Sequence, residues 1–93
     1  MHIKATYEKK MRQQLEEVKQ EISELKNKAA HMETNLQLEY FTLVDELEVK
    51  LEIAEQKFYL LTQAAADDWE EFKTEFERVW GSVRELVKSI TSP

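Results

Sequence analysis

Two histidines and a short run of carboxylates are the side chains in this chain best suited to bind a metal or transfer a proton. His2 lies at the N-terminus, and His31 lies in a polar stretch whose nearest acids are Glu24 and Glu33. No two histidines are four residues apart, and no HExxH motif is present, so the spacing that places two ligands on one helix face is missing. The sequence predicts surface histidines and no metal site.

The carboxylates Asp67, Asp68, Glu70 and Glu71 could attract a divalent cation. On a helix, however, consecutive positions point to different sides, and the spacing does not match an EF-hand loop. We expect them to be solvated acids at the start of a helix. The chain has no cysteine and one glycine, which argues against thiol chemistry and phosphate-binding loops. We therefore expect no enzyme activity, no cofactor and no small-molecule substrate.

The elements that would position any such residue are helical. Apolar residues recur at steps of three or four along almost the whole chain, and the average step of about 3.6 residues is the pitch of a straight α-helix. The members of this stripe are Met11, Leu15, Val18, Ile22, Leu25, Ala29, Met32, Leu36, Tyr40, Leu43, Leu47, Leu51, Ala54, Phe58, Leu61, Ala65, Trp69, Phe72, Phe76, Val79, Val83, Leu86 and Ile90.

We predict an all-α, elongated, coiled-coil-like protein with a single helical domain over residues 1–93. One very long helix over about 5–64 continues, or folds back, into a C-terminal helix over about 67–91. Three consecutive alanines at 64–66 favour continuity, whereas the acids that follow favour a kink or turn at 64–68. Gly81, followed by Ser82, is a second candidate break or a mid-helix glycine.

Two stretches within the long helix are ambiguous. Residues 27–35 have the lowest helix propensity, yet the stripe stays in phase across them, so we expect helix throughout. Residues 47–53 alternate strictly between apolar and polar, which is typical of a half-buried strand. No turn residue is available to pair that strand with a neighbour, so helix is preferred there as well.

The apolar surface in the middle of the chain is wider than one helix–helix contact requires. Between Leu36 and Leu61, 15 of 26 residues are apolar, so this stretch should contact two neighbours. The net charge of residues 1–31 is +2 and that of residues 32–68 is −7, which favours antiparallel pairing within one chain or between two. We therefore expect homo-oligomers, with a helix–helix interface formed by Leu36, Tyr40, Leu43, Leu47, Leu51, Phe58, Leu61, Trp69, Phe72, Phe76 and Trp80.

The aromatic C-terminal segment has two interpretations. Trp69, Phe72, Phe76 and Trp80 share one helix face, which either packs in a core or lies on a membrane surface. The polar face of that helix is rich in glutamate and would be repelled by anionic lipid, so core packing is preferred.

The lysines of the N-terminal third alternate with glutamates, and the net charge is −6, so nucleic acid is not an expected partner. No apolar run could span a bilayer or act as a signal peptide, and we expect a cytoplasmic protein.

Three blocks of the sequence resemble a family of small bacterial coiled-coil proteins associated with stress responses. They are YEKKMRQQLEEVKQEISELKNKA from Tyr7, LEYFTLVDELEVKLEIA from Leu38 and DDWEEFKTEFERVWGSV from Asp67, the last with two tryptophans on an acidic helix. The resemblance implies helix–helix assembly and no catalytic residues. This chain has Ala66 where the family often has glycine, and Val18 where it often has an aromatic residue. Our leading hypothesis is a non-enzymatic helical assembly protein, and the alternative is a peripheral membrane-binding protein.

Overall fold

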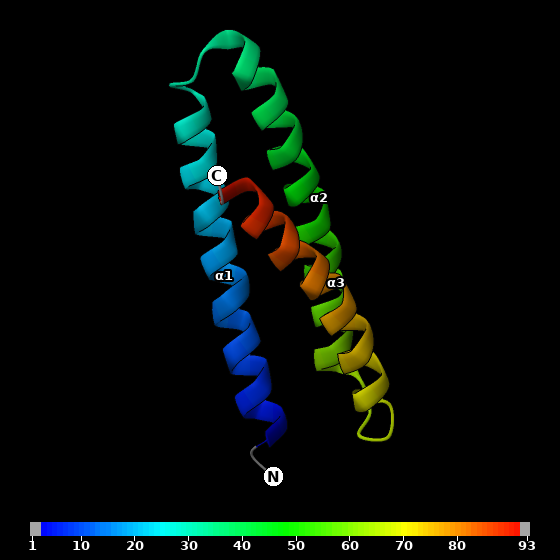
Figure 1. The fold of residues 1–93 in the computed structure, drawn as a ribbon. Coiled ribbons are helices and arrows are strands. Elements are labelled where there is room, and N and C mark those ends of the chain that lie inside the picture. The colour runs from blue at the N-terminus through cyan, green and yellow to red at the C-terminus, as the bar shows by residue number, and fades with distance from the viewer. Residues whose placement is uncertain (1–2, 92–93) are drawn as a thin grey trace.

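The computed structural model describes residues 3–91 and has three helices (Figure 1). They are α1 (Ile3–Ala29), α2 (Thr34–Gln63) and α3 (Trp69–Thr91). α2 runs antiparallel to α1, and α3 turns back along the lower part of α2 (Figure 1). The described part is entirely helical apart from its two connections and measures 51 × 20 × 18 Å. The expected all-α, elongated fold is confirmed, and residues 47–53 belong to α2 rather than to a strand.

A single helix over 5–64 is wrong, because the chain reverses at residues 30–33. This is the stretch of lowest helix propensity, and a backbone carbonyl at the end of α1 has a hydrogen-bond partner there. The Gln37 side chain donates a hydrogen bond to the Ala29 carbonyl at 3.0 Å, and Lys26 and Lys28 supply positive charge to the last turn. A straight helix cannot bury its own apolar stripe, so reversal here lets α2 cover α1.

The second connection lies at residues 64–68, where a kink or turn was one of the two expected outcomes. Ala64 leaves the helix in an extended conformation, with its N–H still bonded to the Leu61 carbonyl at 3.2 Å. α3 then begins after Asp68, with Glu70 and Glu71 in its first turn, where negative charge is favourable. Gly81 lies inside α3 and does not end a helix.

One continuous core runs through the three helices, and it consists largely of the predicted stripe. Its buried members are Met11, Leu15, Val18, Ile22, Leu25, Val44, Leu47, Leu51, Ala54, Phe58, Leu61, Trp69, Phe76, Trp80 and Val83. The narrow stripe of α1 packs on one side of α2, and α3 packs on another. The apolar middle of the sequence therefore meets its two neighbours within the chain.

The opposite charges of the N-terminal third and the middle also meet within the chain. Lys19 pairs with Glu55 at 2.9 Å, and Lys26 pairs with Glu48 at 3.0 Å. Both pairs cross from α1 to α2, which is the antiparallel pairing that the charge distribution favoured. They are half-exposed, so each contributes little to stability.

Candidate interaction surfaces

The predicted interface residues lie mostly inside the chain's own bundle. Leu47, Leu51, Phe58, Leu61, Trp69, Phe76 and Trp80 are buried, while Tyr40 and Phe72 are half-buried against the same core. Leu43 is half-buried, and Leu36 is exposed near the start of α2. The fold therefore uses these residues for packing between its own helices.

Trp69 joins the start of α3 to the start of α1. Its indole N–H donates a hydrogen bond to the Glu8 carboxylate at 3.2 Å, and its ring meets the Tyr7 ring edge-on at 5.5 Å. The Lys73 ammonium lies over both rings, 4.9 Å from the centroid of Tyr7 and 5.6 Å from that of Trp69. Burial raises the pKa of Tyr7, and the negative charge of Glu77 raises it further. The aromatic face of α3 is thus covered by the chain itself.

The side of α2 that faces away from the core carries a second row of apolar residues. Leu38, Val49, Ile53 and Leu60 retain 75%, 57%, 41% and 44% of their exposure. At about 100° per residue, these four positions fall within about 60° of one another around the helix. We call this row the outer stripe of α2. It was absent from the predicted interface, although the alternation at 47–53 and the wide apolar middle both indicated apolar residues on a second face.

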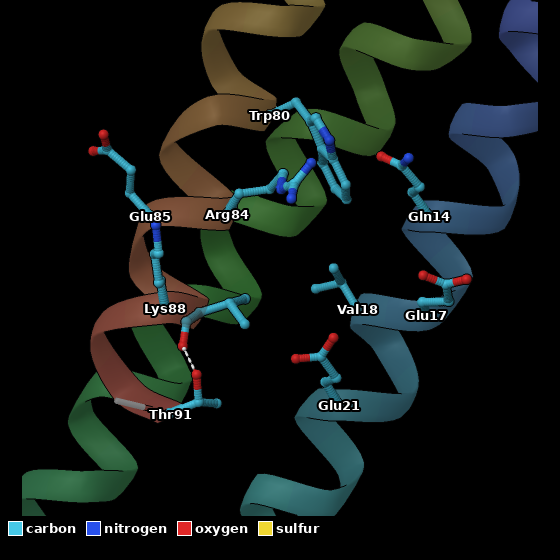
Figure 2. A pocket seen from close by; sticks show the side chains of 10 residues that line it. Gln14, Glu17, Val18, Glu21, Trp80, Arg84, Glu85, Lys88 and Thr91 are labelled. Atoms are coloured by element: carbon cyan, nitrogen blue, oxygen red, sulfur yellow. Dashed lines mark hydrogen bonds between the residues drawn. The ribbon is translucent and has the colours of Figure 1, made fainter. Parts of the chain in front are cut away.

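A groove of about 440 Å³ separates α1 from α3 (Figure 2). Val18 from α1 and Trp80 and Val87 from α3 supply its apolar lining. α2 contributes no residue to it, so the groove opens on the surface away from α2. The α1 and α3 backbones stand apart throughout, with no Cα of one helix within 8 Å of a Cα of the other. Bulky side chains, Trp69 at one end and Trp80 in the groove, fill the space between them.

The two walls of the groove carry opposite charges. Glu17 and Glu21 lie on the α1 side, and Arg84, Glu85 and Lys88, with a net charge of +1, lie on the α3 side. Figure 2 shows Arg84 reaching toward α1, while Glu85 points away from it and the Lys88 side chain runs along α3 toward Glu85. Among residues 3–91 none of these charged residues forms an ion pair within 4 Å. We call Glu17 and Glu21 the acidic wall, and Arg84 and Lys88 the basic wall.

Two polar atoms beside this groove have no hydrogen-bond partner among the described residues. They are the indole Nε1 of Trp80, a donor, and the side-chain Oε1 of Gln14, an acceptor. Both are buried from solvent, so each keeps the cost of desolvation without a compensating bond. The packing beside the groove therefore leaves one buried donor and one buried acceptor unsatisfied.

The residues considered for metal chemistry are dispersed at the surface. His31 is exposed, and its Nδ1 lies 2.8 Å from the Asn27 carbonyl oxygen. The acids around 67–71 are exposed at the second turn and the start of α3. Within residues 3–91 no three acidic or histidine side chains come together as a metal site, and His2 lies outside the described residues. None of the three helices is both long and apolar enough to cross a bilayer.

Comparison with protein-family models, curated protein sequences and solved structures finds no match for this chain. The case for its function therefore comes from the outer stripe of α2 and the groove between α1 and α3.

Proposed function

We propose that this chain is a non-enzymatic, cytoplasmic assembly protein that acts by helix–helix self-association through the outer stripe of α2. The observation that carries the proposal is the row formed by Leu38, Val49, Ile53 and Leu60 on the helix face opposite the core. Scattered surface apolar residues need no explanation, but a row aligned along one helix face is a typical docking surface. The resemblance to bacterial stress-associated coiled-coil proteins agrees with this role.

The strength of such an association follows from the area available. Fully burying an aliphatic side chain contributes about 1.5–3 kcal/mol, and the four residues of the stripe are roughly half exposed, so burying them contributes on the order of 4 kcal/mol. Loss of translational and rotational freedom offsets much of that gain. We therefore expect weak, reversible association that grows with protein concentration.

Sedimentation velocity from low to high micromolar concentration tests this proposal. The wild-type chain should show a rising average mass, and the double variant Val49→Glu/Ile53→Glu should remain at the 11.1 kDa monomer mass. Ile3→Glu is the matched control, because Ile3 is 75% exposed on α1 and lies outside the stripe. A wild-type chain that stays monomeric at every concentration would refute self-association, and an unchanged double variant would refute the stripe as its site.

Substitutions at the predicted interface residues cannot serve as this test. Leu47 is fully buried and Leu51 nearly so, and a lysine at either position would place a charge in the core. Such a variant would lose its fold before it revealed anything about association. The stripe positions are exposed, so their charged variants should keep the helical circular dichroism of the wild type.

Membrane binding through α3 makes a different prediction. Trp69, Phe76 and Trp80 are buried, so their insertion into lipid would require α3 to leave the bundle. Tryptophan emission should therefore be blue-shifted in buffer, and vesicles of anionic phospholipid should not change it. A further blue shift that depends on lipid, together with co-sedimentation of the chain with the vesicles, would favour the membrane hypothesis instead.

A further inference from the structure

We propose that the groove between α1 and α3 receives the outer stripe of α2 from a second copy, so that copies join head to tail rather than stripe to stripe. This inference rests on the proposed function, because it takes self-association as given and identifies the receiving surface. The stripe and the groove lie on opposite sides of the molecule. Each copy therefore has one of each, and the contact can repeat from copy to copy.

The two surfaces match in length and in lining. The apolar end of the stripe, from Val49 to Leu60, spans about 16 Å at 1.5 Å per residue. The α3 wall of the groove, from Trp80 to Thr91, spans the same number of residues. The apolar lining consists of Val18 and Trp80, each 6% exposed, and the half-buried Val87, so Val87 offers most of the surface that aliphatic side chains can cover. The protruding stripe of one copy thus meets the groove of the other.

The stripe is flanked by opposite charges, as the groove is. Asp45 and Glu52 lie at its edge toward α1, on the side where Glu55 pairs with Lys19. Lys50 lies toward α3 with its ammonium 3.4 Å from the Ser82 hydroxyl, and Lys57 pairs there with Glu75 at 3.4 Å. Glu46 lies on the same side of α2, one turn before Lys50. We call Asp45 and Glu52 the acidic flank, and Lys50 and Lys57 the basic flank.

Charge complementarity selects one orientation of the second copy. If it keeps the orientation of the first, its acidic flank faces the acidic wall and its basic flank faces the basic wall. If it is turned end over end, the acidic flank faces Arg84 and Lys88, and the basic flank faces Glu17 and Glu21. Opposite charges then meet along both sides of the docked helix. Successive copies in this arrangement are antiparallel.

A contact between two different surfaces leaves one stripe and one groove free at the ends of every assembly. Unless the geometry closes into a ring, such a contact produces an open series of copies. A stripe-to-stripe contact would instead use the same surface on both partners and stop at a dimer. The two arrangements therefore differ in what mixed variants can form.

Two variants with exposed substitutions distinguish these arrangements by sedimentation velocity. The stripe variant is Val49→Glu/Ile53→Glu, with its groove intact, and the groove variant is Arg84→Glu/Lys88→Glu, with its stripe intact. We expect each to remain monomeric alone. Mixed in equal amounts, they should form a 1:1 pair of twice the 11.1 kDa monomer mass and nothing larger. Circular dichroism confirms that both are folded.

Each other outcome refutes a specific statement. If the groove variant associates as well as the wild type and the mixture forms no new species, the groove is not the receiving surface, while self-association through the stripe stands. If the wild-type chain is monomeric throughout, the proposed function fails and the inference fails with it. A last pair of variants tests the orientation: Asp45→Lys/Glu52→Lys alone should stay monomeric, and combining it with Arg84→Glu/Lys88→Glu in one chain should restore association. A fourfold variant that stays monomeric would refute the end-over-end arrangement.

Discussion

Replacing each tryptophan with phenylalanine isolates the hydrogen bond that joins α3 to α1. Trp69→Phe and Trp80→Phe remove the same atoms from two buried side chains of one helix. The N–H of Trp69 donates to the Glu8 carboxylate at 3.2 Å, whereas the N–H of Trp80 is buried without a partner among the described residues. Trp80→Phe is therefore the matched control for Trp69→Phe.

The two substitutions should differ in cost by about 2 kcal/mol. A hydrogen bond to a charged acceptor contributes roughly 1.5–3 kcal/mol, and we take about 1 kcal/mol because Glu8 is only half-buried. Removing an unpartnered buried donor relieves about 1 kcal/mol or more of desolvation cost. The sum corresponds to about a 30-fold difference in the folding equilibrium constant between the two variants.

Urea unfolding followed by circular dichroism measures this difference. At low micromolar concentration the chain is expected to be monomeric, and equal m-values would show that the same surface is exposed on unfolding. In the Trp69→Phe background, a further Glu8→Gln change should cost nothing, since its partner is already gone. Equal losses in the two tryptophan variants, or a larger loss in Trp80→Phe, would refute the assigned hydrogen bond.

The remaining predictions concern the core, the surface and pH. Phe76 is fully buried and stacks on Trp80 at 6.1 Å, so Phe76→Ala should cost about 3–5 kcal/mol in urea unfolding, whereas the exposed Tyr59→Ala should change stability by less than about 0.5 kcal/mol. Glu55 raises the pKa of Lys19, but their ion pair is half-exposed, so a double-mutant cycle should give at most about 1 kcal/mol and close to zero in molar salt. The pKa of Tyr7 is raised in the folded chain, so the unfolded chain loses this proton first and stability should fall as pH rises above about 10. Urea unfolding at increasing pH should show a smaller fall in Tyr7→Phe, and an equal fall in both chains would contradict the assignment.

The period of the apolar stripe predicted the helices and most of the core because burial of one helix face depends on spacing alone. It could not locate the reversals. The steps from Ala29 through Met32 to Leu36, and from Leu61 through Ala65 to Trp69, keep the helical phase across both connections. A continuous helix and two helices joined in phase therefore give the same pattern. The free energy gained by burying the stripe decides between them, and it depends on the tertiary fold rather than on the local sequence pattern.

The outer stripe was present in the sequence but was assigned to no partner. The predicted interface followed the positions with the most regular spacing, such as Leu47 and Leu51, and these became the core of the bundle. Val49 and Ile53 lie two residues beyond each of them, on the opposite side of the helix. The two faces could be separated only once α1 and α3 were known to cover the first.

The charges of the groove show what folding adds to a pattern that looks uniform in the sequence. Lysines and glutamates alternate along α1, and such a mixture is ordinarily a solvated face. In the folded chain, Lys19 and Lys26 turn toward the acids of α2, while Glu17 and Glu21 line the groove. The lysines of α1 that pair with α2 and the glutamates of α1 that line the groove therefore have separable roles. Reversing Glu17 and Glu21 to lysine should abolish head-to-tail association with little effect on unfolding, whereas reversing Lys19 and Lys26 should weaken α1–α2 packing and leave the groove intact.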